Sequence, residues 1–195
     1  MAINTKAIKN RIKSVGNTKK ITKAMEMVSA AKMRKSVEAA LNTRTYAVMA
    51  RELMHHLSKV EKKATYELLK ERPVKNLLVI LISSNRGLCG SFNANIARKT
   101  ALALKDVQTL STHHTAEGKE ILPEKDIKIN IIGIGKKSAD FAKRQGYNLV
   151  AMYDNLSEAK NFEEIVPISR MFMEEFKKSN YDKVVVAYTD YKSSL

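Results

Sequence analysis

Lys75-Asn-Leu-Leu-Val-Ile-Leu-Ile82 decides the fold, because its last six residues form one unbroken apolar run. An apolar run without alternation is typical of a strand that is covered on both faces, as in a parallel sheet. Two further segments rich in apolar residues follow at 127–134 and 183–189, and a shorter one lies at 149–153. We therefore expect four strands, with 183–189 as a final buried strand.

Helical patterns alternate with these strands. They cover residues 93–104, 136–145 and 163–178, and Pro167 is expected to disturb the first turns of the last helix. Strands that alternate with helices predict an α/β fold with a mainly parallel, doubly wound sheet. The polar stretch from Gln108 to Asp126 interrupts this pattern, and we expect it to form a mobile surface insertion.

The N-terminal third has a different composition. Residues 1–60 carry thirteen Lys and Arg side chains against three acids, which is most of the net charge of +15. Gly16 is the only glycine before Gly87, no proline precedes Pro73, and good helix formers dominate. One helix over about 4–58 is predicted, roughly 80 Å long. The sequence thus divides into a basic arm (1–60), a linker (61–74) and an α/β domain (75–195).

The arm carries two apolar stripes and one basic line. Helical spacing places the stripes on different sides of the helix, and they consist of Ile8, Ile12 and Val15, and of Ile21, Met25 and Val28. The basic line between them consists of Lys6, Lys9, Lys13, Lys20 and Lys23. A regular two-stranded coiled coil would keep a single seam, so we expect different partners at different heights. A solvated helix with a solubilising basic face is the alternative.

Composition excludes several classes of protein. An apolar content of 44% excludes disorder of the whole chain. The longest apolar run is far shorter than the ~20 residues of a membrane-spanning helix, and the N-terminus lacks the apolar core of a secretory signal. The single cysteine, Cys89, excludes an intrachain disulfide framework. We expect a soluble, basic, intracellular protein with an acidic partner.

Two turns, each between a predicted strand and a predicted helix, are candidate phosphate-binding sites. Gly133-Ile-Gly135-Lys-Lys-Ser138 imitates a dinucleotide fingerprint, with Asp154 near the position of a ribose-binding acid. Ser138 replaces its third glycine, however, and a tight turn explains the other two. Residues 85–93 lack the lysine of a phosphate-binding P-loop. We therefore expect no cofactor and no nucleotide site.

Candidates for catalysis or metal binding are few. Cys89 precedes a helix and could act as a nucleophile, but the favoured interpretation is a small buried thiol in a tight turn. The adjacent pairs at 55–56 and 113–114 are the chain's only histidines, and the first pair is expected to be helical. Neighbours on a helix point in different directions, so such a pair makes a poor metal site without other ligands. No enzyme active site is expected.

Two long motifs resemble those of one family, the gamma subunits of F-type ATP synthases. The first reads Arg11-Ile-Lys-Ser-Val-Gly-Asn-Thr-Lys-Lys-Ile-Thr-Lys-Ala-Met-Glu-Met-Val-Ser-Ala-Ala-Lys-Met-Arg-Lys35 and resembles the family's N-terminal helix. The second reads Ser83-Ser-Asn-Arg-Gly-Leu-Cys-Gly-Ser-Phe-Asn93 and resembles the loop after its first strand, with Asn85 in place of the usual Asp. Bacterial members look most similar, and the match implies the N-terminal two thirds of the family's length.

The resemblance implies a rotor without catalytic residues. In the family, the N-terminal helix pairs with a C-terminal helix in an antiparallel coiled coil inside the alpha–beta hexamer, and a Rossmann-like domain lies against epsilon and the c ring. Proton-driven rotation changes the catalytic sites in turn. The implied location is the cytoplasmic face of the bacterial inner membrane, with membrane contact only through the complex.

The resemblance also implies roles for particular residues. Lys20, Lys23 and Met25 are expected to meet acidic loops of the beta subunits. Five apolar residues are expected to contact the C-terminal helix or the hexamer lining, namely Ile8, Ile12, Val15, Ile21 and Val28. Four residues are expected to form a structural turn, namely Arg86, Gly87, Cys89 and Gly90.

Three other functions fit parts of the sequence less well. Nucleic-acid binding would suit the charge, but the arm offers Tyr46 as its one aromatic side chain for stacking on bases. A membrane-surface helix would need one wide apolar face, and the stripes do not form one. A dehydrogenase would rest on the turn at Gly133 alone. We therefore expect no nucleic-acid partner.

Overall fold

The computed structural model describes residues 5–60, 67–114, 120–154, 156 and 162–193. The chain divides into two units, one formed by residues 1–56 with 191–195 and the other by residues 57–190. Part of the predicted linker, residues 61–66, lies outside the described residues. So do residues 115–119 of the predicted surface insertion.

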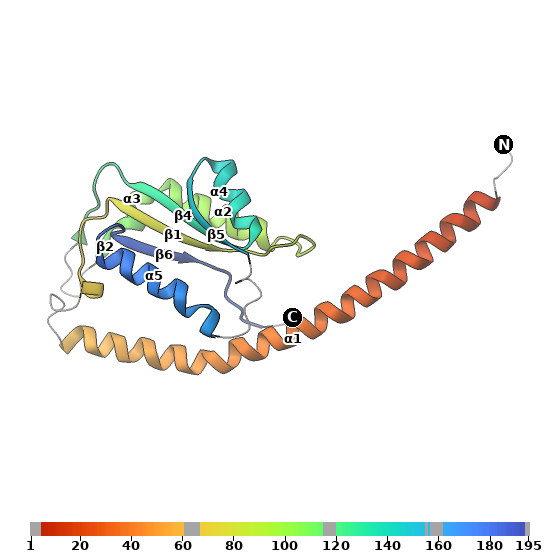
Figure 1. The fold of residues 1–195 in the computed structure, drawn as a ribbon, viewed down its shortest axis with the longest axis horizontal. Coiled ribbons are helices and arrows are strands. Elements are labelled where there is room, and N and C mark those ends of the chain that lie inside the picture. The colour runs from red at the N-terminus through yellow and green to blue at the C-terminus, as the bar shows by residue number, and fades with distance from the viewer. Residues whose placement is uncertain (1–4, 61–66, 115–119, 155, 157–161, 194–195) are drawn as a thin grey trace. The chain divides into compact units, whose positions relative to one another are not determined.

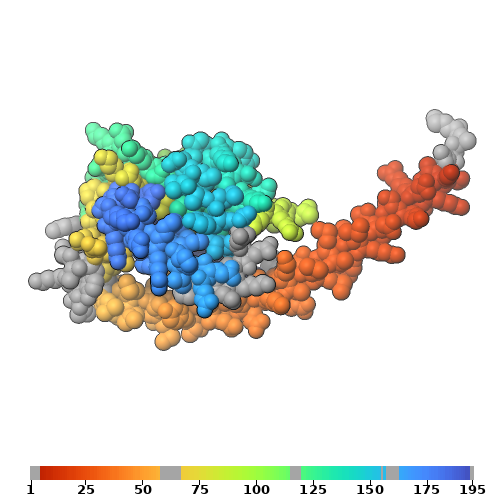
Figure 2. All heavy atoms as spheres, viewed as in Figure 1, coloured from red at the N-terminus to blue at the C-terminus, as the bar shows by residue number. Residues whose placement is uncertain are grey.

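The first unit is built on one helix. Helix α1 (Thr5–Val60) runs for 56 residues without a break, and it follows one continuous curve in Figure 1. Threonine hydroxyls along it donate to carbonyls four residues earlier, as Thr18 does to Ser14 and Thr43 to Ala39. Figure 2 shows its N-terminal half as a rod of side chains. The helix predicted for the arm is confirmed.

The second unit contains a four-stranded parallel sheet. Its strands are β1 (Asn76–Ile82), β4 (Lys128–Ile134), β5 (Asn148–Tyr153) and β6 (Lys183–Ala187), in the order β5-β4-β1-β6. The chain moves outward from β1 to β5 and then crosses back to place β6 on the other side of β1. Right-handed crossovers in opposite directions put their helices on opposite faces. The predicted α/β class and doubly wound sheet are confirmed.

The helices occupy both faces, as Figure 1 shows. Helices α2 (Phe92–Lys105) and α4 (Lys136–Gln145) cover one face, and α5 (Val166–Lys177) covers the other. Smaller elements complete the unit, namely η2 (Glu67–Leu69), α3 (Val107–Ser111), β2 (His113–His114), β3 (Glu120–Ile121) and η4 (Phe162–Glu164). Strands β2 and β3 pair with each other antiparallel.

Strand β1 forms the centre of the core. Its alternate residues Leu77, Val79 and Leu81 are buried against α2 and α4, and the residues between them are buried toward the face of α5. From the helices, Ile96 and Phe141 join this core. A strand with a hydrogen-bonded neighbour on each side and helices on both faces needs apolar side chains at every position.

The structure corrects three expectations at the boundaries. Strand β6 is half-exposed rather than buried, because it lies at the edge of the sheet and has one neighbour, β1. Helix α5 begins at Val166 rather than at 163, because Pro167 lacks an N–H and fits only the first turn of a helix. The stretch from Gln108 to Asp126 contains α3 and the paired strands β2 and β3, so it is partly regular. Its mobility stays a prediction.

A charged cluster ties the first strand to the last one. The Arg72 Nε donates to Asp182 Oδ1 at 2.7 Å, and the same guanidinium donates to the Phe176 and Tyr181 carbonyls. The other carboxylate oxygen, Asp182 Oδ2, accepts the backbone N–H groups of residues 75 and 76. Both side chains are largely buried. This cluster links the amino ends of β1 and β6.

We expect the Asp182→Ala variant to unfold more easily by about 3 kcal/mol, because it leaves the Arg72 guanidinium buried without its carboxylate. The matched control is Glu124→Ala, which breaks the exposed pair between Lys75 Nζ and Glu124 at 3.8 Å. That change should cost less than about 1 kcal/mol. Urea denaturation measures both values, and equal losses would contradict the role given to the cluster.

Candidate partner-binding surfaces

The loop after β1 caps a neighbouring helix. Three residues of this loop accept the first N–H groups of α4: Asn85 Oδ1 accepts from Lys136 at 3.0 Å, the Ser84 carbonyl from Lys137 at 3.2 Å, and Ser83 Oγ from Ser138 at 2.7 Å. The N-cap residue of α4, Gly135, makes no side-chain cap bond. The groups that would hold a pyrophosphate at this helix N-terminus are therefore already bonded within the fold.

The two glycines of the apparent fingerprint are explained by close packing. Gly135 has a φ of +92°, and a Cβ there would lie 2.3 Å from the Ser83 carbonyl oxygen. At Gly133 a Cβ would lie 2.7 Å from Ser138 Oγ. Gly135 lets the loop after β1 and the turn before α4 approach each other, and Gly133 lets the first turn of α4 pack close to β4. This favours the tight-turn interpretation over a nucleotide site.

Asn85 joins three parts of this end of the sheet. Its Oδ1 caps α4, and its Nδ2 donates to the backbone carbonyl of Asp154 at 2.7 Å, just beyond β5. An aspartate at this position could accept from Lys136 but could not donate to Asp154. The asparagine thus makes a bond that an aspartate at this position could not make.

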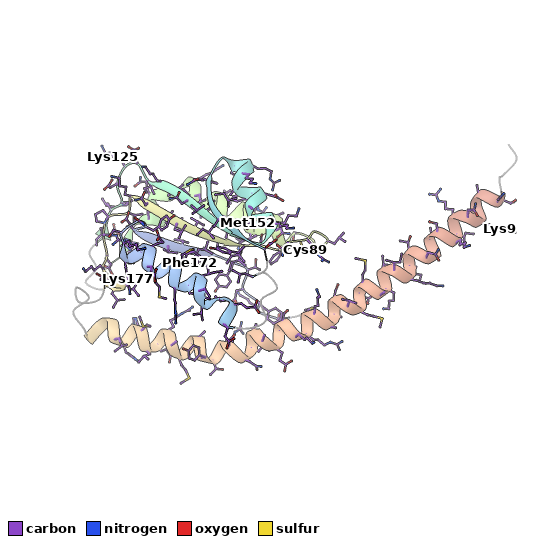
Figure 3. The ribbon with its side chains drawn as sticks, in the orientation of Figure 1. Lys9, Cys89, Lys125, Met152, Phe172 and Lys177 are labelled. Atoms are coloured by element: carbon purple, nitrogen blue, oxygen red, sulfur yellow. The ribbon has the colours of Figure 1, made fainter. Side chains whose placement is uncertain are left out.

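The turn at 86–90 projects beyond the carboxyl ends of the strands, where Figure 3 labels Cys89. The predicted turn residues Arg86, Gly87, Cys89 and Gly90 are all exposed. The buried thiol expected at Cys89 is therefore wrong, because the turn points away from the core. Its sulfur instead accepts from Asn93 Nδ2 at 3.0 Å, just inside α2.

Leu88, at the tip of this turn, was missed by the sequence analysis. Its side chain is 95% exposed, and its φ of 63° is rare for a residue with a Cβ. The side chain of this fully exposed leucine adds no stability through burial, and its backbone conformation is strained. A continuous run of apolar residues predicts a strand, but a single leucine in a loop gives no such signal. Only the backbone conformation in the structure identifies Leu88 as a candidate partner-contact residue.

The predicted contact residues of α1 all lie on its surface. The apolar ones are between 47% and 67% exposed, namely Ile8, Ile12, Val15, Ile21, Met25 and Val28. Lys23 Nζ pairs with Glu26 at 3.0 Å, and both side chains are about two-thirds exposed. Such a pair contributes under about 1 kcal/mol, so it can be exchanged for another acidic partner at little cost. The structure contains no partner that tests these roles.

A groove lies on the same unit farther along α1. It has a volume of about 590 Å³, and its lining includes Met33, Val37 and Leu41 from the helix together with Tyr191. The Tyr191 carbonyl accepts a hydrogen bond from the Arg44 guanidinium at 2.6 Å. The sequence offers no signal for this contact, because 147 residues separate its two members.

The described residues contain neither a metal-binding cluster nor a membrane-spanning helix. No group of three or more His, Cys, Asp or Glu side chains in these ranges is arranged to hold a metal ion. His113 is half-buried, and His114 pairs with Glu120 at 3.4 Å. Within the same ranges, no helix combines the length and the apolar character that crossing a membrane requires.

Comparison with known proteins gives one consistent result. A family model described as ATP synthase matches residues 4–195. The ATP synthase gamma chain of Chlorobium phaeobacteroides (strain BS1) is 37% identical over 97% of this chain and 61% of its own length. The ATP synthase gamma chain of Desulforamulus reducens is 33% identical over 96% of this chain and 60% of its own length. The ATP synthase gamma chain of Chloroherpeton thalassium is 37% identical over 95% of this chain and 58% of its own length. The chain thus spans about 60% of the curated relatives it matches.

We expect Gly135→Ala to destabilise the chain by about 3 kcal/mol or more, since its methyl would add a clash with the Ser83 backbone to an unfavourable φ. The matched control is Gly146→Ala, which has a φ of +74° and nothing within 4 Å of the added Cβ. That variant should lose only about 1 kcal/mol. Urea denaturation compares them, and equal losses would show that the loop contact is not tight.

Proposed function

The chain belongs to the ATP synthase family, and we propose that it is the N-terminal part of a gamma chain, the central-stalk rotor subunit of a proton-translocating F-type ATP synthase. In this role it couples proton flow through the c ring to ATP synthesis in the alpha–beta hexamer. The single observation that supports it most strongly is α1, a 56-residue helix with its apolar side chains exposed. The family match along residues 4–195 supplies the context.

The role we propose is mechanical and not catalytic. A rotor needs a long element that contacts several subunits and a folded body that is held at the other end. The first helical N–H groups of α4, the best candidates for holding a phosphate, are bonded by the loop after β1. We therefore assign this chain the transmission of rotation and leave the chemistry to the catalytic subunits of the complex.

The surface of α1 supports separate contacts along its length. We propose that Ile8, Ile12 and Val15 contact a partner on one side of α1, and that Ile21 and Val28 contact a partner on another side. Each partner is either the C-terminal helix of an antiparallel coiled coil or the lining of the hexamer. Burying a large aliphatic side chain contributes about 1.5–3 kcal/mol, so these contacts would stabilise a helix that lacks them in its own unit. Residues 1–60 would form the shaft.

The basic line of α1 supports contacts with acidic loops of the beta subunits. Lys20 and Lys23 lie on this line, and Met25 is a flexible apolar side chain that adapts to irregular surfaces. The exposed pair between Lys23 and Glu26 shows how weakly such a lysine is held. Weak, exchangeable pairs suit a contact that must pass from one beta subunit to the next.

The α/β domain, residues 75–195, completes the proposal. We propose that it lies against the epsilon subunit and the c ring, on the cytoplasmic face of the bacterial inner membrane. The protein would then reach the membrane only through the complex. The exposed turn around Leu88 is a surface that a subunit of the same complex could cover.

Charge reversal on the basic line tests this proposal. Lys20→Glu with Lys23→Glu in the full-length subunit should lower the number of protons pumped per ATP hydrolysed in reconstituted vesicles, because acidic loops would then be repelled. Assembly, followed by gel filtration, should change less. The matched control is Lys32→Glu with Lys35→Glu. It makes the same charge change at the same spacing along α1, at two lysines that do not belong to the basic line. Unchanged pumping with unchanged hydrolysis in the first variant would favour a merely solubilising face.

A further inference from the structure

A cavity opens at the amino ends of the strands, at the opposite end of the sheet from the Cys89 turn. Its volume is about 500 Å³, which is typical of small-molecule sites, and residues of η2, β2, α5 and β6 line it. All of them belong to the second unit. Figure 3 labels Phe172 on α5, at the side of this helix that faces the sheet. The apolar lining consists of Leu68, Leu69, Phe172, Met173, Phe176 and Val184.

Lys183 brings a positive charge to this apolar lining. It is the first residue of β6, and its Nζ donates to the Thr112 carbonyl at 3.0 Å. Among the residues that the structure describes, no carboxylate forms an ion pair with it. Burial lowers the pKa of the Lys183 ammonium. An ammonium has three donors, so this half-buried group can bind a further acceptor.

The acid beside Lys183 in the chain is already occupied. Asp182 also lines the cavity, but its carboxylate accepts from the Arg72 guanidinium and from two backbone N–H groups. Glu71 lies on the same wall and has an interaction of its own. The fold therefore neutralises Asp182 with an arginine, while the bond described for the Lys183 ammonium is the one to the neutral Thr112 carbonyl.

His113 adds a second polar group that the fold does not satisfy. It lines the cavity, and its Nε2 is buried without a hydrogen-bond partner in the described structure. Burial and the nearby charge of Lys183 lower the pKa of His113, and the charge of Glu71 opposes them in part. Buried polar atoms nearly always have partners, so two incompletely satisfied groups on one cavity call for an explanation.

We propose that this cavity binds a small carboxylate with an apolar body, held through the Lys183 ammonium and packed against Phe172 and Phe176. The apolar body would remove the exposed lining from water, and the carboxylate would complete the hydrogen bonds of the ammonium. An uncharged apolar ligand would instead leave a desolvated ammonium unpaired, which is costly. This site is separate from the rotor function proposed above.

Octanoate titrated into the purified chain tests the site, with backbone amide NMR shifts as the readout. We expect saturable shifts centred on the residues that line the cavity. Octan-1-ol has the same apolar chain without the charge and should bind at least tenfold more weakly. Lys183→Met keeps most of the side chain and removes the ammonium, so it should weaken octanoate binding tenfold or more. The control Lys178→Met, at an exposed lysine just after α5, should leave the affinity unchanged.

A second variant keeps the test decisive if Lys183→Met fails to fold. Met173→Trp places a larger side chain in the cavity and retains Lys183, and circular dichroism checks its fold. It should abolish the shifts around the cavity. Equal affinity for octanol and octanoate, binding that survives Met173→Trp, or shifts confined to the basic helix α1 would each overturn the proposal.

Discussion

Apolar side chains along α1 lie exposed in their own unit, and the proposed function depends on this constraint. A helix in water gains most of its stability from packing rather than from the intrinsic preferences of its residues. The stripes of α1 provide surface for such packing, and the basic line provides charge, and the side chains of both stripes are exposed. A long helix of this kind is most stable when other chains surround it.

The second unit is organised differently, because hydrogen bonds within the fold hold the ends of its central strand β1. The Arg72–Asp182 cluster links the amino ends of β1 and β6, and the loop from Ser83 to Asn85 caps α4 at the carboxyl end of the sheet. Between them, β1 is buried on both faces. These features produce a body that can be held by its surface while torque passes through α1, as the proposed rotor function requires.

The sequence predicts where the helices and strands lie along the chain better than it predicts which residues surround each of them. Segments rich in apolar residues identify β1, β4 and β6, and a long segment without proline identifies α1, because these signals are local. Whether a strand lies at the edge of a sheet depends on its neighbours, so the burial expected for β6 was wrong. The exposure of Cys89 also depends on its surroundings, and so do the hydrogen bonds that Asn85 and Tyr191 make with residues distant in the sequence. The assigned contacts of α1 stay predictions, since their partners are other chains.

Hydrogen exchange along α1 tests the central claim most directly. Amides of residues 5–35 would be followed by mass spectrometry in the purified chain and again after the alpha and beta subunits are added. We predict fast exchange in the isolated chain and strong protection in the mixture, while β1 stays protected in both. Exchange in α1 that is slow without the other subunits, or that is unchanged when they are added, would contradict the account.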